Sequence, residues 1–171
     1  MSVEIRCLSP SDAVAFRALR LEALRSAPEA FGASYAETLL RTEADFADGI
    51  ATAAPGAIFG AFEGEAMVGS AGLMVPGTEK QRHKGVLWGV YVQPAFRGRG
   101  ISRGLVEAVI EQARQGLAIL QTSVVVGNDV ARNTYISCGF VVTGLEPKAL
   151  SVNGVFLDQE HLALDFTQPG A

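Results

Sequence analysis

The sequence predicts a fold that combines helices and strands, of class α/β (α+β). It is expected to have a mixed central sheet of about six to seven strands flanked by about four helices. Three observations predict it. Apolar runs of strand length alternate with segments whose apolar residues recur at helical spacing. The continuous apolar run GVLWGVYV, residues 85–92, is typical of a strand buried at the centre of a sheet. Two turns, Glu63-Gly64-Glu65 and Asn153-Gly154, are typical of antiparallel hairpins.

The first half of the chain predicts a strand, two helices and a hairpin. Residues 3–8 alternate as in a half-buried strand, and Ser9 and Pro10 then suit the first positions of a helix that runs to about Ser26. A second helix is expected at about residues 35–48, ending near Gly49. Residues 56–76 contain the first hairpin, which leads through a polar loop into the central strand.

The second half of the chain continues the alternation. Ile101, Leu105 and Val109 recur at helical spacing in a helix expected from Gly98 to about Gly116. The later elements are a buried strand, a short helix, a strand and a closing hairpin, at residues 117–126, 128–138, 139–144 and 148–166.

Composition limits the class of protein. With 171 residues, of which 49% are hydrophobic and 19% charged, the chain is expected to form one domain over residues 1–171. A formal net charge of -4 argues against a protein that coats nucleic acid. Cys7 and Cys138 lack metal-site spacing, so we expect reduced thiols and no metal. The beginning MSVEIRCLSPSD lacks a basic segment followed by an apolar one, and no run reaches the roughly 18 residues of a membrane span. We therefore expect a cytoplasmic protein that does not bind membranes.

The stretch FRGRGIS, residues 96–102, lies between the central strand and the next helix. A helix that begins here presents unpaired backbone N–H groups and the positive end of its dipole, which favour an anion. Gly98 and Gly100 let a ligand approach the backbone, and Arg97 and Arg99 add charge suited to phosphate oxygens. The pattern indicates a pyrophosphate site, although alone it is equally compatible with a glycine-rich turn whose arginines face water.

Two other phosphate-binding patterns fit less well. A P-loop requires Gly-Lys-Ser or Gly-Lys-Thr, and neither string occurs in the sequence. A dinucleotide-binding motif needs a third glycine at position 103, where Arg103 stands, and it normally follows the first strand of the fold.

The longer string YVQPAFRGRGIS resembles the acyl-CoA-binding motif of the GNAT superfamily of N-acetyltransferases. In that motif Gln or Arg is followed by two residues, Gly, one residue, and Gly or Ala; here Arg97, Gly100 and Ser102 stand at these places, with Ser102 a small departure. A second string, NDVARNTYISCGF, is similar to the family pattern Asn-x-x-Ala-x-x-x-Tyr-x-x-x-Gly-Phe. The matching residues are Asn128, Ala131, Tyr135, Gly139 and Phe140.

The resemblance implies the GNAT fold, with a sheet splayed around the acyl-CoA site, and transfer of an acetyl group from acetyl-CoA to an amine of a small molecule or peptide. It also implies that the backbone of Val90 and Val92 pairs with the pantetheine amides and that Asn128 touches this arm. By the same resemblance the pyrophosphate is held by Arg97, Gly98, Arg99, Gly100, Ile101 and Ser102. The resemblance to the family also suggests that the protein forms a homodimer.

Tyr135 lies seven residues after Asn128, nearly two helical turns, so both side chains face the same way. Its phenol is protonated at neutral pH, and the resemblance gives it the role of general acid to the departing thiolate. The glutamate that many family members carry on the central strand is absent from GVLWGVYV. Glu37 and Asp158 rank first as candidate bases, ahead of Glu79, His83 and Glu160. In the alternative, no residue acts as base and the amine arrives neutral from water. An alternative function is a non-catalytic acyl-CoA sensor or interaction module of the same fold.

Overall fold

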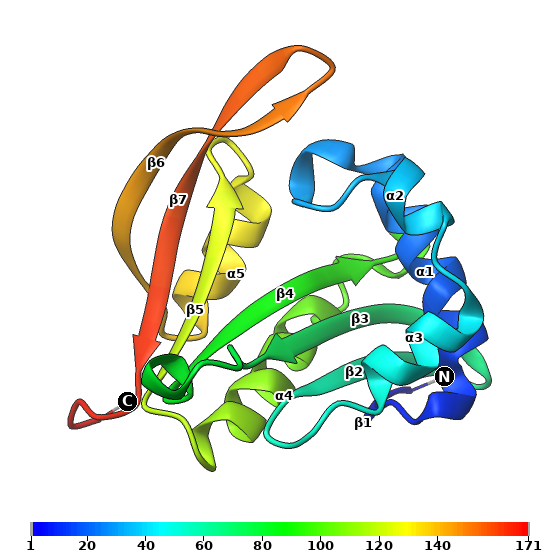
Figure 1. Ribbon diagram of the computed structural model, residues 1–171, viewed down its shortest axis with the longest axis horizontal. Helices are drawn as coiled ribbons and strands as arrows, with labels where there is room; N and C mark the ends of the chain where they lie inside the picture. Colours follow the sequence, from blue (N-terminus) through cyan, green and yellow to red (C-terminus); the bar gives the residue numbers. More distant parts are fainter. Residues whose placement is uncertain (1, 171) are drawn as a thin grey trace.

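Seven strands form one mixed sheet in the computed structural model, which describes residues 2–170 (Figure 1). In sheet order the strands are β1 (Val3–Cys7), β2 (Ala57–Glu63), β3 (Ala66–Met74), β4 (Lys84–Val92), β5 (Ile119–Val125), β7 (Val155–Asp165) and β6 (Val141–Val152). Neighbours are antiparallel except β4 and β5, which are parallel. The helices are α1 (Ala13–Ser26), α2 (Tyr35–Leu39), α3 (Glu43–Ile50), α4 (Ile101–Arg114) and α5 (Asp129–Ser137). The predicted fold class and the central place of β4 are confirmed.

Helices cover both faces of the sheet. Ala61 and Phe62 are neighbours on β2 and point to opposite faces: Ala61 joins the core beneath α4, and Phe62 joins the core beneath α1 and α3. Leu105 of α4 and Phe16 of α1 are buried at the centres of these two cores. The predicted helical spacing of apolar residues in α4 therefore corresponds to its buried side.

β4 and β5 pair over only a short distance and then separate. Their pairing comprises Lys84 with Ile119, Gly85 with Leu120 and Val86 with Gln121. Immediately beyond, the buried hydroxyl of Thr122 donates a hydrogen bond of 3.1 Å to the carbonyl oxygen of Leu87. From there the two strands diverge, as Figure 1 shows. The sheet thus has an opening between its two central strands.

A bulge in β4 occurs beside this opening. Ser70 pairs with Tyr91 and Gly72 with Trp88, so that Gly89 and Val90 together face the single residue between Ser70 and Gly72. Gly89 has φ 63°, a left-handed conformation that favours glycine. The bulge redirects the backbone of β4 at the point where the strands separate.

Two predicted elements differ from the structure. The helix expected at residues 35–48 is divided into α2 and α3, because Thr42 and Asp45 form a capping box that begins a new helix. The strand expected at residues 139–144 and the first strand of the last hairpin are one long strand, β6. An irregularity between Glu146 and Leu150, with Lys148 at φ 53°, bends β6 without ending it.

Candidate functional site

A cleft of about 740 Å³ lies where β4 and β5 separate. Its walls are the ends of these strands, the beginning of α4, the inner side of α5 and the segment between α1 and α2. Seven residues predicted to bind the cofactor line it: Val90, Val92, Arg97, Gly98, Ser102, Asn128 and Tyr135. The structure therefore brings both sequence motifs to one cavity.

The beginning of α4 faces this cleft through Gly98 and Ser102. Gly98 and Gly100 have φ 75° and φ 76°, so the turn requires residues that tolerate the left-handed region. The N-cap position is Gly100, and no side chain caps the helix there. The first N–H groups of α4 and the positive end of its dipole are thus directed to the ligand side.

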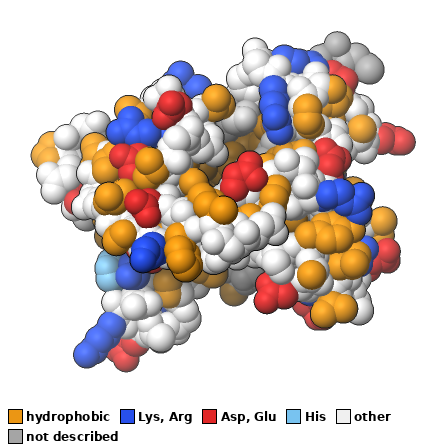
Figure 2. Space-filling view, turned by 90° about the horizontal axis from the view of Figure 1, so that it is seen from above, with side chains coloured by type: hydrophobic (Ala, Val, Ile, Leu, Met, Phe, Trp, Pro, Cys, Tyr) orange, Lys and Arg blue, Asp and Glu red, His pale blue; other side chains and the backbone are white. Residues whose placement is uncertain are grey.

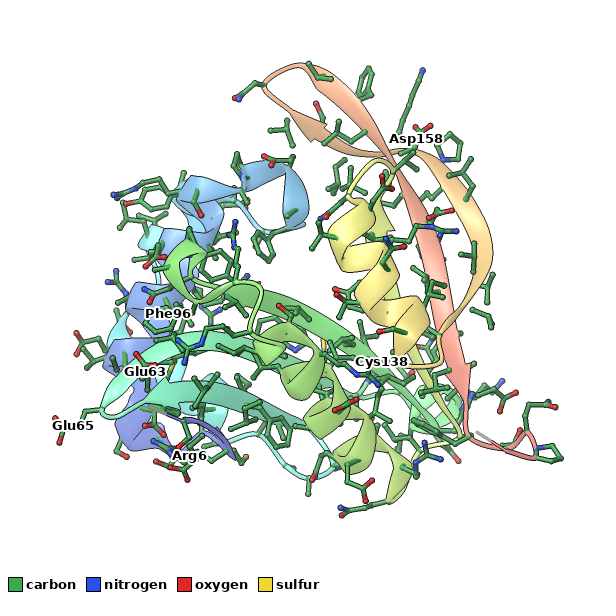
Figure 3. The ribbon with its side chains drawn as sticks, turned by 180° about the vertical axis from the view of Figure 1, so that it is seen from behind. Arg6, Glu63, Glu65, Phe96, Cys138 and Asp158 are labelled. Atoms are coloured by element: carbon green, nitrogen blue, oxygen red, sulfur yellow. The ribbon has the colours of Figure 1, made fainter. Side chains whose placement is uncertain are left out.

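Other residues of the predicted pyrophosphate site have additional contacts. Arg97 donates from Nε to the carbonyl oxygen of Val92 at 3.0 Å. Arg99 forms an ion pair of 2.9 Å with Glu63. The side chain of Ile101 is buried in the core, so only its backbone can serve a ligand. Arg99, Gly100 and Ile101 do not line the cleft itself. Figure 3 shows Phe96 in the turn just before α4.

The backbone of β4 is exposed to the opening at alternate residues. The N–H of Gln93 donates to Val68 of β3 at 2.9 Å. Because successive backbone groups of a regular strand point to opposite sides, those of Val92 point away from β3, toward β5. Val90 belongs to the bulge and lines the cleft, where an added extended ligand can pair with the backbone of β4.

Tyr135 of α5 packs between the core and the cleft, with 7% of its surface exposed. Burial raises the pKa of Tyr135 to about 12, and a hydrogen bond with Thr122 partly offsets this effect. The phenol is therefore protonated throughout the neutral range. Asn128 is the N-cap of α5: its Oδ1 accepts from the N–H of Ala131 at 3.3 Å, and its amide nitrogen is the remaining donor group.

The two candidate bases have structural hydrogen bonds and do not line the cleft. The Glu37 carboxylate accepts the Ser34 hydroxyl at 2.8 Å at the beginning of α2. Asp158 accepts the N–H of Lys148 at 2.7 Å, in the bent part of β6. Figure 3 shows Asp158 on β7 beside the beginning of α5.

One carboxylate lines the cleft among the described residues: that of Glu29, in the segment between α1 and α2. Sequence reasoning missed it, because Glu29 stands in the connecting segment APEAFGAS, which carries no catalytic motif. Thr122 was missed for a similar reason: it is one polar residue in an apolar strand, and only its bond to Leu87 reveals its position.

A second hollow, of about 500 Å³, lies beside β1 and α1. Arg6 and Asp12 of its lining form an ion pair of 2.8 Å, and Glu4 and Glu65 also line it. The Arg6 guanidinium holds the pKa of the Asp12 carboxyl well below its usual range. Elsewhere in residues 2–170 no cluster of three or more His, Cys, Asp or Glu could bind a metal ion. No described helix has the length and hydropathy needed to cross a membrane.

Seen from above, the molecule presents acidic, basic and hydrophobic side chains interspersed with one another (Figure 2). This face differs from the basic stripe that nucleic-acid phosphates select.

A helix N-terminus, an open strand and a buried phenol lie around one cleft, an arrangement that suits an extended ligand carrying phosphate groups. Residues 17–140 match the model of the Acetyltransferase (GNAT) family. The chain belongs to this family, as its motifs predict.

Known proteins agree with this assignment. The chain is 35% identical, over 99 residues, to the N-alpha-acetyltransferase RimI of Mycobacterium tuberculosis. That match covers 56% of this chain and 58% of RimI, so the chain spans little more than half the length of this curated relative.

Solved structures share the fold over nearly the whole chain. A GNAT-family acetyltransferase from Streptococcus pneumoniae has a TM-score of 0.86 at 22% identity, covering 96% of this chain and 99% of that one. The putative acetyltransferase yncA from Salmonella typhimurium, solved with its cofactor acetyl-CoA, has a TM-score of 0.80 at 21% identity, covering 100% and 98%.

Proposed function

We propose that residues 1–171 form a single N-acetyltransferase domain that transfers the acetyl group of acetyl-CoA to an amine of a small molecule or peptide. The observation that carries the proposal is the cleft between β4 and β5, which joins the beginning of α4 to Tyr135. The name of the RimI relative, an N-alpha-acetyltransferase, supports an α-amine as acceptor.

Acetyl-CoA is held from two sides in this proposal. Gly98 to Ser102 and Arg97 bind the pyrophosphate at the beginning of α4, where backbone N–H groups and the helix dipole favour anions. The pantetheine arm extends along β4 and pairs with the backbone of Val90 and Val92. Asn128 contributes its amide from the opposite wall.

The chemistry is a direct attack on the thioester. The amine nitrogen bonds to the acetyl carbon, and the N–H of Val90 stabilises the oxyanion that develops on the acetyl oxygen. The carbon–sulfur bond then breaks, and Tyr135 protonates the departing thiolate. Burial raises the pKa of this phenol, so it carries the proton to be donated at neutral pH.

Glu29 is the proposed acceptor of the amine proton, because it is the carboxylate that lines the cleft. We expect Glu29→Gln to lower kcat/KM by about 10- to 100-fold near neutral pH, with a smaller loss at high pH, where the amine arrives neutral. Glu37→Gln and Asp158→Asn are the matched controls: each removes a carboxylate charge, and each is expected to change kcat/KM less than about 3-fold. Steady-state rates across pH measure all three variants. A larger loss in either control than in Glu29→Gln would transfer the base role to that residue.

Two further parts of the proposal concern the environment of the enzyme. A homodimer is supported by the exposed apolar side chains of the β6–β7 hairpin, among them Val141, Leu145 and Phe156, and the molar mass in solution tests it.

A cytoplasmic location is supported by the two free thiols, Cys7 and Cys138, and fractionation of cells that express the protein tests it.

Calorimetry with acetyl-CoA, followed by an assay of CoA thiol release with a panel of amines, tests the function. We expect binding and acceptor-dependent release. Absence of binding would refute the cofactor site. Binding without transfer to any amine would instead favour the acyl-CoA sensor.

A further inference from the structure

Arg20 of α1 is a buried charged side chain that forms no ion pair with any of residues 2–170. It is 7% exposed, and its Nη1 has no hydrogen-bond partner among the described residues. Burial, together with the nearby charge of Arg41, lowers the pKa of Arg20 to about 10, which leaves it cationic at neutral pH. A buried cation with an unsatisfied donor is costly, and an apolar side chain of similar size is often as stable or more so. The unsatisfied Nη1 donor makes Arg20 a candidate for binding an anionic ligand.

The guanidinium lies at the bulge of β4. A Cβ placed on Gly89 would be 3.2 Å from Nη1 of Arg20, so this donor lies directly beside the glycine. The rings of Phe31 and Trp88 enclose the group, with centroids 5.1 and 5.4 Å from its central carbon. Phe31 also lines the cleft, and it therefore forms the boundary between the cleft and the guanidinium.

The position of Arg20 relative to the reaction is set by the strand. Gly89 directly precedes Val90, whose backbone is the proposed oxyanion donor. One residue of a strand advances by about 3.3 Å. An anionic group that lies beside Gly89 is therefore close to the acetyl carbon that the amine attacks. This spacing fits an acceptor whose amine and anionic group are bonded to the same carbon. It does not fit an acceptor with a long chain between these two groups.

We propose that Arg20 binds the carboxylate of the acceptor and that the acceptor is a free α-amino acid. This inference rests on the proposed acetyltransferase function and specifies its substrate class. The Phe31 side chain rotates to admit the carboxylate. The carboxylate then accepts a hydrogen bond from Nη1 of Arg20, which has no partner in the free protein. Glu29, two residues before Phe31, faces the α-ammonium group from the cleft wall. Cation and carboxylate thus match the two charges of a zwitterion.

Acceptor preference tests the proposal directly. With acetyl-CoA saturating, kcat/KM is measured for a panel of L-amino acids and for the matching L-amino acid amides, which keep the amine and lose the carboxylate charge. We expect the preferred acid to exceed its amide by about 10- to 100-fold. Arg20→Met should remove this preference by lowering kcat/KM for the acid alone, and Arg20→Lys should keep part of it.

The matched control is Arg17→Met, which removes the same charge from the exposed side of the same helix. Arg17 donates to the backbone carbonyls of Arg41 and Leu39 and does not line the cleft. We expect the acid-to-amide ratio of this variant to equal that of the wild type. Melting temperatures give a second readout: Arg20→Met should melt no lower than the wild type if Arg20 serves a ligand.

Trp88, the only tryptophan of the chain, reports binding without turnover. In the CoA complex, its fluorescence should change on titration with an amino acid and remain constant with the corresponding amide. Equal rates and equal fluorescence responses for acids and amides would overturn the proposal while leaving the acetyltransferase function intact. A melting temperature that falls in Arg20→Met with an unchanged acid preference would assign Arg20 to packing. Failure to bind acetyl-CoA would contradict the proposed function instead.

Discussion

Replacement of Tyr135 by phenylalanine is expected to lower kcat by about 10²- to 10⁴-fold, the range over which a positioned proton donor contributes to catalysis. The dissociation constant of acetyl-CoA should change by less than about 3-fold, because the ring and its packing against Phe140 are preserved. Stopped-flow or steady-state assays of thiol release measure kcat, and calorimetry measures binding.

The matched control for this substitution is Tyr91→Phe. Tyr91 also lines the cleft, but its hydroxyl donates to Glu22 at 2.9 Å and lies within a separate network. We expect this variant to retain most of the activity. Full turnover in Tyr135→Phe, on an acceptor that the wild type acetylates, would remove the general-acid role from Tyr135.

The buried phenol of Tyr135 should also make the folding stability of the wild type depend on pH at high pH. Tyr135 has a folded-state pKa of about 12 against an ordinary value of 10.0. The folded state therefore binds more protons than the unfolded state between these values, and stability falls as pH rises above 10, by up to about 1.4 kcal/mol per pH unit. Below pH 10 the full contribution is present. Denaturant titrations should show this loss in the wild type and a weaker one in Tyr135→Phe.

Replacement of Ser102 by aspartate is expected to weaken acetyl-CoA binding by about 100-fold or more. Ser102 lines the cleft in the first turn of α4, where the pyrophosphate is proposed to bind. Two like charges about 4 Å apart near a protein surface repel by about 4 kcal/mol, and each 1.4 kcal/mol is a factor of ten in affinity.

The folding stability of Ser102→Asp should move in the opposite direction, or remain constant, because an acidic side chain in the first turn of a helix is favourable. Weaker acetyl-CoA binding without a loss of folding stability would distinguish a binding defect from a folding defect. Ser102→Ala is the control and should bind acetyl-CoA within about 3-fold of the wild type. If Ser102→Asp bound acetyl-CoA as tightly as the wild type, the pyrophosphate would have to lie elsewhere.

The sequence predicted those features that depend on local chemistry. The apolar run of β4, the glycine turns and the helical spacing in α4 each specify their element through a few neighbouring residues, and the structure confirms them. The division between α2 and α3 was missed because the hydrophobic pattern continues across it, while the Thr42 capping box favours a new beginning.

The acceptor side of the cleft could not be predicted in this way. Glu29 and Arg20 become relevant only when the segment after α1 folds against the bulge at Gly89, more than 50 residues away in the sequence. Such proximity depends on tertiary packing and leaves no periodic or motif-like signal. The cofactor side has a contiguous motif because a single turn and helix build most of it.

The separation of β4 and β5 has a consequence for solubility. Beyond the bond from Thr122 to Leu87, each strand has an unpaired margin. At the periphery of a sheet such a margin is a template for intermolecular pairing and aggregation. Here the two margins lie inside the fold and face a cleft, and the strands are joined beside it by three residue pairs. Unpaired backbone groups in this place serve an extended ligand without forming an outer edge of the sheet.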